Sequence, residues 1–167
     1  MIVSWCRQLK AVGVAVDAQC GWSGGGASRL TESRLAIGGN EIACFATPTR
    51  LRANKSNLYK WVFNGARLYQ QLAQHYTLSS CARRGSLACC ETFPHAVVCA
   101  LAGRGAAWPK RETRRNALWQ CGYDVGSLTN VDFVCAGLCA ITSDAFLHGS
   151  AMLHGNKVEG FIVVPVG

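Results

Sequence analysis

The chain has 167 residues, of which 50% are apolar and 16% charged, a composition that excludes a disordered protein. This length is sufficient for one domain with its own hydrophobic core, and we expect a single α/β domain over residues 1–167. Its 17 Lys and Arg residues outnumber nine Asp and Glu, and the formal charge of +8 favours a polyanionic partner, nucleic acid first, over a merely basic protein. No apolar run approaches the roughly 20 residues that span a bilayer, and the first ten residues do not resemble a secretory leader, so we expect no membrane association and a cytoplasmic location.

The expected elements alternate between strands and helices along the whole chain. They are a helix tail at 4–11, a strand at 12–16, a helix at 28–38, a strand at 41–45, a helix at 57–76 with Ser56 as its N-cap, a strand at 87–91, helices at 95–103, 110–120 and about 130–148, and a strand at 159–165. This alternation predicts a sheet with helices packed on it.

Two of these strands are short and apolar and end at an acidic residue. Asp17 directly follows the strand at 12–16, and Glu91 is the last residue of the strand at 87–91. Neither strand shows polar alternation, so both read as buried strands of a parallel sheet. The carboxyl ends of such strands meet at one edge, where ligands bind, and paired carboxylates there suit a divalent cation. The alternative for each acid alone is that it caps the next turn or helix.

Three further groups could belong to the same site. His95 follows Pro94 close to Glu91 and could act as a catalytic base or a metal ligand, or could be a buried or capping histidine. Asp132 follows Thr129 at capping-box spacing, which predicts a structural acid in the first helical turn. The helix at 110–120 carries Lys110, Arg111, Arg114 and Arg115, a face suited to a phosphate backbone or simply to solvent.

Ten cysteines are a high number for a chain of this length. They show no Cys-x-x-Cys pair, and Cys135 and Cys139, one helical turn apart, have no second pair at zinc spacing. We therefore interpret most of them as small buried apolar residues.

Five segments in order resemble a known family. They are Val14-Ala-Val-Asp-Ala-Gln-Cys-Gly-Trp-Ser23, Phe45-Ala-Thr-Pro-Thr-Arg50, Phe63-Asn-Gly-Ala-Arg-Leu-Tyr69, Glu91-Thr-Phe-Pro-His-Ala96 and Glu159-Gly-Phe-Ile-Val-Val-Pro165. Together they resemble an uncharacterised domain family predicted to be ribonuclease-H-like nucleases, over about residues 12–165. The resemblance implies a mixed sheet flanked by helices and phosphodiester hydrolysis with Mg²⁺ or Mn²⁺, with Asp17 and Glu91 on two acidic positions and His95 on the histidine of the Glu-Thr-Phe-Pro-His motif.

The chain departs from this family in two places that matter for activity. Family members generally begin with a strand carrying Gly-Ile-Asp, and this chain starts too late to contain it, so we expect the opening strands and one acid to be missing. The family's late helix tends to read Asp-x-x-Asp, whereas here Asp132 is followed by Cys135, a poor ligand for magnesium.

The resemblance and its departures leave two readings of function. The first is a metal-dependent nuclease in which Asp17, Glu91 and Asp132 hold the metal, with Lys110, Arg111, Arg114 and Arg115 on the nucleic acid. The second is a non-catalytic, nucleic-acid-binding or fragmentary member of the same family. A chain without the opening strands would also expose a sheet edge, through which it could oligomerise.

Overall fold

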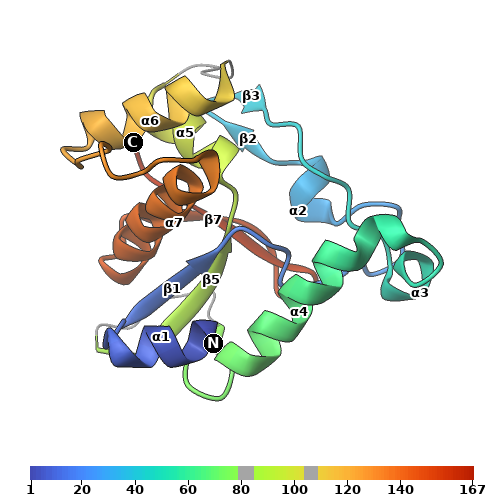
Figure 1. Cartoon of the computed structure of the whole chain (residues 1–167). Helices are drawn as coiled ribbons and strands as arrows, with labels where there is room; N and C mark the ends of the chain where they lie inside the picture. Colours follow the sequence, from blue (N-terminus) through green and yellow to red (C-terminus); the bar gives the residue numbers. More distant parts are fainter. Residues whose placement is uncertain (79–84, 104–108) are drawn as a thin grey trace.

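The computed structural model describes residues 1–78, 85–103 and 109–167. Its central sheet has the strand order β1-β5-β7-β6, with β4 paired to the first residues of β5 (Figure 1). The strands of this sheet are β1 (Gly13–Val16), β4 (Thr77–Leu78), β5 (Ala88–Thr92), β6 (Ala151–Asn156) and β7 (Gly160–Pro165). Strands β1, β4 and β7 run parallel to β5 and β6 runs antiparallel to β7, so the predicted α/β class is confirmed.

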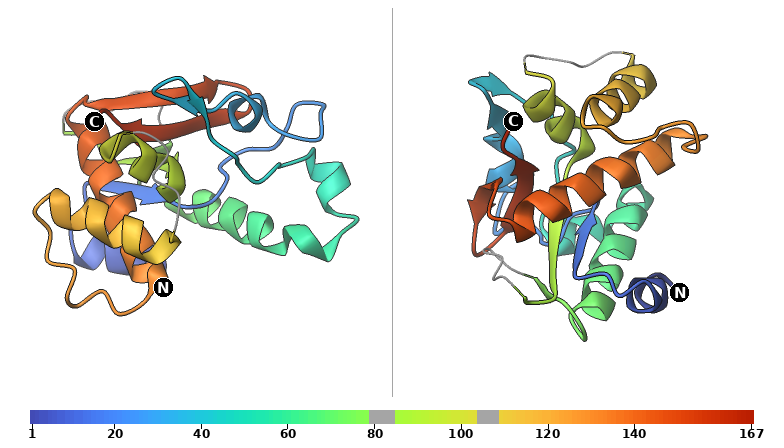
Figure 2. Two further views of the ribbon diagram at one scale, coloured as in Figure 1. Left: turned by 90° about the horizontal axis from the view of Figure 1, so that it is seen from above. Right: turned by 90° about the vertical axis from the view of Figure 1, so that its left-hand side faces the viewer.

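Helices cover both faces of this sheet (Figure 2). They are α1 (Ile2–Gln8), α2 (Leu30–Ser33), α3 (Arg50–Ala53), α4 (Lys60–Leu72), α5 (Pro94–Leu101), α6 (Lys110–Gln120) and α7 (Val131–Leu147), with a 3-10 turn at Asn57–Tyr59. Side chains alternate between the two faces of β5, so Cys89 packs with Tyr69 and Leu72 of α4, while Cys90 packs with Phe146 of α7.

Helix α7 lies directly against β1 because position 13 is a glycine. A Cβ atom there would overlap Ser143 Oγ and come within 2.8 Å of Leu147 Cδ1. On the outer side of this layer, α5, α6 and α7 share a second core that includes Val97, Leu118 and Leu138. This packing fixes α6 and α7 beside the end of β1.

Strand β1 is an edge strand and β5 is central. Strand β5 is buried at all five residues, as its apolar sequence predicts, whereas the four residues of β1 are only half buried. Ala88 N donates to Val12 O, so the backbone groups of Gly13 and Ala15 point away from β5. Among the described residues β1 pairs only with β5.

Several predicted elements differ from the observed ones. The helix expected at 28–38 is a single turn, α2, and the strand expected at 41–45 shrinks to β3 (Asn40–Glu41), which pairs with β2 (Ala36–Ile37) outside the main sheet. The secondary structure of such short runs depends on the neighbours that tertiary packing places beside them. Strand β6 was not predicted, because its glycine and polar residues read as a loop.

Helix α4 begins later than predicted, after the 3-10 turn. Ser56 Oγ accepts a hydrogen bond from Leu58 N at 3.2 Å, so Ser56 caps that turn. Val62, Tyr69 and Leu72 of this helix are buried, whereas Trp61 is exposed. No helix among the described residues is long and apolar enough to cross a membrane.

Candidate functional site

Asp17 and Glu91 lie at the same edge of the sheet. In the parallel register Val16 is opposite Glu91, so Asp17 lies one residue beyond the end of β1, beside Thr92, the last residue of β5. Both acids border a small cavity of about 60 Å³, which is large enough to hold water. The geometry therefore brings together the two strand-end acids that the sequence singles out.

Glu91, however, is occupied by an internal partner. Its side chain is buried, and Arg29 donates to both of its oxygens, from Nη1 to Oε2 at 2.8 Å and from Nη2 to Oε1. Cys20 N also donates to Oε2, at 2.7 Å. A carboxylate that is neutralised in this way belongs to a structural ion pair and is not free to bind a metal ion.

Arg29 was not recognised from the sequence, and it organises a buried network. It is fully buried, and its Nε donates to Glu32 Oε1 at 2.7 Å. Glu32 Oε2 accepts from Thr47 N, at 2.7 Å, and from Arg29 N, at 3.1 Å. The Arg29–Glu32 spacing of three residues within a helical turn is the only sequence signal that could have indicated this network.

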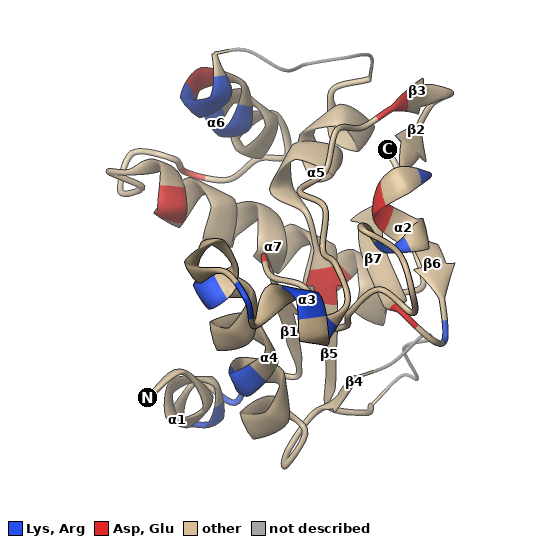
Figure 3. Cartoon of the chain, turned by 90° about the vertical axis from the view of Figure 1, so that its right-hand side faces the viewer, with Lys and Arg blue, Asp and Glu red and all other residues tan. Residues whose placement is uncertain are grey.

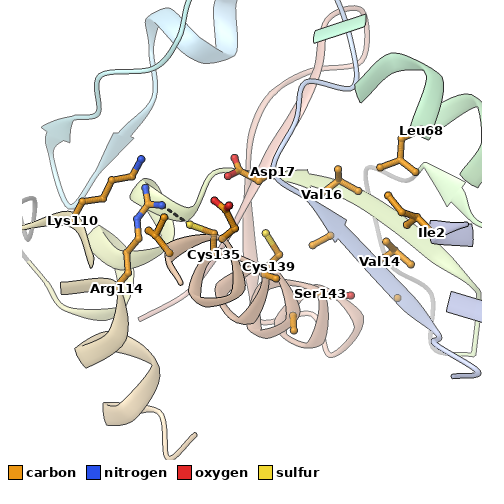
Figure 4. A pocket seen from close by; sticks show the side chains of 16 residues that line it. Ile2, Val14, Val16, Asp17, Leu68, Lys110, Arg114, Cys135, Cys139 and Ser143 are labelled. Carbon is orange, nitrogen blue, oxygen red and sulfur yellow. Dashed lines mark hydrogen bonds between the residues drawn. The ribbon is translucent and has the colours of Figure 1, made fainter. Parts of the chain in front are cut away.

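Asp17 borders a larger recess on its other side (Figure 4). This recess has a volume of about 530 Å³ and runs along β1 between α7 and the side chains of Ile2 and Leu68. Most of its walls are apolar. The charged residues that line it are Asp17, Lys110, Arg114 and Asp132. We call this cavity the Asp17 recess.

The recess raises the pKa of Asp17. Although the residue keeps an exposed surface, burial of its carboxyl disfavours the charged form most, and the nearby acids Glu91 and Asp132 raise the pKa further. The cations Arg114 and Lys110 act in the opposite direction and lower it. A carboxyl that is disfavoured as an anion inside a recess is typical of functional sites.

We therefore expect Asp17→Asn to raise the melting temperature at pH 7. Because the pKa of Asp17 is higher in the folded state, the native protein binds this proton more tightly, and stability falls as the pH rises from the unfolded pKa through the folded one. The gain from the variant should shrink as the pH is lowered through that window. Thermal unfolding of both proteins between about pH 4 and pH 7 measures this difference. A variant that melts lower at pH 7 would show that Arg114 and Lys110 stabilise the carboxylate after all.

Asp132 does not cap its helix in the predicted way. The N-cap of α7 is Asn130, whose Oδ1 accepts from Phe133 N at 2.9 Å, one residue later than the Thr129 capping box requires. The side chain of Asp132 is exposed and lines the Asp17 recess. The interpretation of Asp132 as the capping-box acid is wrong, because the amide side chain of Asn130 supplies the cap and the Asp132 carboxylate has no hydrogen-bond partner among the described residues.

Cys135 also lines the recess, one turn after Asp132, and Arg114 Nη1 contacts its Sγ (Figure 4). Burial raises the pKa of the Cys135 thiol, and Arg114 opposes this. The Cys135 thiol therefore faces the guanidinium group of Arg114, a position in which an acidic side chain would form an ion pair.

His95 sits at the second position of α5, next to the buried Pro94. Burial lowers its pKa, and the cations Arg114 and Lys110 lower it further, which favours the neutral imidazole. Its ring lies 5.8 Å from that of Phe93, centroid to centroid. His95 thus lies on the α6 side of the site and does not line the Asp17 recess.

The arginines of α6 are mostly engaged with the protein itself. Arg115 donates to the carbonyl oxygens of Leu128 and Val125, and Arg111 donates to Thr129 O at 3.1 Å. Arg114 is buried in contact with Cys135. These bonds hold the loop between α6 and α7, so Lys110 is the residue of this group that faces the recess without a hydrogen bond to any described residue.

The described residues do not fit a complete magnesium or manganese centre. Such ions need several oxygen ligands, and two-metal chemistry needs carboxylates that bridge them. Within the described ranges, no group of three or more His, Cys, Asp or Glu side chains is placed to hold a metal ion. Asp17 and Asp132 are the carboxylates that the recess offers, beside the soft sulfur of Cys135.

Comparison with known proteins places the chain in one family. Searches of curated proteins and of solved structures each gave no significant match. A family model described as "Protein of unknown function (DUF429)" matches residues 1–159. That match covers nearly the whole chain, and the resemblance noted in the sequence to an uncharacterised domain family is thereby confirmed. The chain belongs to the DUF429 family of proteins of unknown function.

Proposed function

We propose that this protein is a ribonuclease-H-like domain that binds nucleic acid and hydrolyses phosphodiester bonds weakly or not at all as it stands. The carrying observation is the ion pair between Arg29 and Glu91, which removes one of the two strand-end acids from any metal site. The recess keeps Asp17 and Asp132, and Cys135 lines it at the position where the family resemblance implies a further acid. Two carboxylates can bind one Mg²⁺ or Mn²⁺ loosely, with water in the remaining positions.

Support for a nucleic-acid partner comes from charge and from the position of the recess. The formal charge of +8 gives a field that attracts polyanions. Lys110 and Arg114 line the same recess as the two acids, an arrangement that suits a phosphate diester held near a bound cation. Figure 3 shows further Lys and Arg residues over α3 and α4.

We expect binding to a mixed-sequence oligonucleotide to be electrostatic and sensitive to salt. The chain offers basic residues and no base-reading motif, so the logarithm of the affinity should fall linearly with the logarithm of the salt concentration. Fluorescence anisotropy at low and at physiological salt measures this slope. Absence of binding at low salt, or an affinity that does not change with salt, would remove nucleic acid as the partner.

Two further expectations about partners and location remain predictions. The outward backbone groups of Gly13 and Ala15 could pair with the same strand of a second copy, which would extend the sheet and bury its edge. A cytoplasmic location is also expected on the sequence grounds given above.

A further inference from the structure

A second cleft lies on the opposite side of the loop that follows β1. It has a volume of about 570 Å³, within the range of ligand sites, and is formed by α3, α4 and residues 20–22. The polar and aromatic residues that line it are Trp22, Arg50, Asn54, Phe63, Arg67, Tyr69 and Gln70. We call it the α3–α4 cleft.

The charge of this cleft differs from that of the Asp17 recess. No Asp or Glu residue lines it. Arg50 and Arg67 are exposed, and neither guanidinium group donates a hydrogen bond or forms an ion pair with any residue in the described ranges. The arginines of α6, in contrast, are bonded to backbone carbonyls or to Cys135. Arg50 and Arg67 are therefore free to contact an anion.

Two aromatic rings form one wall of the cleft. The ring centroids of Trp22 and Phe63 are 4.8 Å apart at an interplanar angle of 46°. Both side chains are half buried, so part of their ring surface faces solvent. Exposed aromatic faces beside free arginines are the combination on which single-stranded nucleic acids bind, through base stacking and phosphate contacts.

Close packing of α4 against the loop after β1 holds this wall in place. Gly65 lies so close to the loop that a Cβ atom there would come within 2.8 Å of Ala18 Cβ. Tyr69, one turn further along α4, donates from its hydroxyl to Ala18 O at 3.1 Å. The same loop carries Asp17 at its start and Trp22 five residues later, so it links the cleft to the Asp17 recess.

We infer that the α3–α4 cleft binds a single-stranded nucleic acid, with Arg50 and Arg67 on phosphates and a base stacked on the Trp22–Phe63 wall. The amide side chains of Asn54 and Gln70 then lie within the cleft as donors and acceptors for the base edge. A duplex is excluded because its bases are stacked on each other and cannot reach the rings. This inference rests on the proposed nucleic-acid function and names the surface and the form of the ligand.

The test is fluorescence anisotropy with a labelled mixed-sequence DNA single strand of about ten nucleotides, a length within the usual range for such sites. Arg50→Ala and Arg67→Ala should each weaken binding several-fold for every sequence and reduce the salt slope by about 1. Arg52→Ala is the matched control, because Arg52 lies on the same helix, is exposed and does not line the cleft. It should leave the affinity and the slope unchanged.

The aromatic wall is tested by Phe63→Leu, which keeps an apolar side chain and removes the ring. We expect this change to weaken binding of the single strand by about fivefold or more, with little effect on the salt slope. Circular dichroism and the melting temperature show whether each variant is folded. A duplex of the same sequence should bind more weakly than the single strand and be indifferent to this change.

The outcomes separate the inference from the proposed function. Salt-sensitive binding that survives all three cleft variants would overturn the inference and leave nucleic-acid binding elsewhere on the chain. An equal loss with Arg52→Ala would also overturn it, by showing a diffuse charge effect. Competition by a mononucleotide as strong as that by the oligonucleotide would replace the strand with a nucleotide as ligand and overturn the inference as stated. No binding at any salt concentration would overturn both proposals.

Discussion

Replacing Arg29 by methionine should lower the free energy of unfolding by about 3–5 kcal/mol, because removal of one partner leaves a buried charge uncompensated. Here two buried carboxylates lose their partner at once, Glu91 and Glu32. A domain of this size is stable by about 5–15 kcal/mol in all, so the variant should lose a substantial share of its stability. Urea denaturation followed by circular dichroism measures the change.

The control is a double variant that replaces the ion pair by apolar groups. Arg29→Met combined with Glu91→Leu removes both opposite charges, so part of the stability should return, although Glu32 stays without its arginine. Lys60→Met serves as a control for loss of one positive charge at an exposed site. If Arg29→Met costs less than about 1 kcal/mol, Glu91 does not depend on this arginine and becomes available again as a metal ligand.

Strands β1, β5 and β7 and the position of Asp17 could be predicted from the sequence because they depend on local patterns. Runs of apolar residues that end in an acid predicted β1 and β5 to within one residue, and the rule that parallel strands share a carboxyl edge brought Asp17 and Glu91 together. Helix α4 was found for the same reason, from the periodic spacing of its apolar residues, whereas α7 was predicted from an apolar run after a capping box that the structure does not form.

The partners of the charged residues could not be predicted, because they come from segments far apart in the chain. Arg29 and Glu91 are 62 residues apart, and nothing in either neighbourhood indicates an ion pair. The loop carbonyls that occupy Arg111 and Arg115 depend on how α6 and α7 pack. Arg111 and Arg115, two residues of the predicted phosphate-binding face, therefore hold the α6–α7 loop in place.

The α3–α4 cleft was missed for a related reason. An amphipathic helix usually buries its aromatic residues in the core, and Tyr69 of α4 is buried in this way. Phe63 is only half buried, because Trp22 meets it from a loop 41 residues earlier rather than from a strand. Only the tertiary structure shows that this pair is open to solvent and flanked by two unpaired arginines.

Restoring one acid should produce measurable hydrolysis in a chain that otherwise shows little or none. We expect the unmodified protein to be inactive or nearly so on nucleic acid with magnesium or manganese, because the recess offers Asp17 and Asp132 and no third carboxylate among the described residues. Cys135→Asp places a third carboxylate one turn after Asp132.

The activity test compares this variant with two others that separate charge from position. Cys135→Asn has the same shape without the charge, and Cys121→Asp adds an acid at an exposed cysteine outside the recess. Cleavage that rises by about tenfold, equivalent to about 1.4 kcal/mol in barrier height, only in Cys135→Asp would support a disabled nuclease site. Magnesium binding by calorimetry should strengthen in the same variant, which gives a second measurement independent of turnover. Robust cleavage by the unmodified chain that disappears in Asp17→Asn would instead show that the recess is already a working site, with oxygen ligands other than the residues assigned to it.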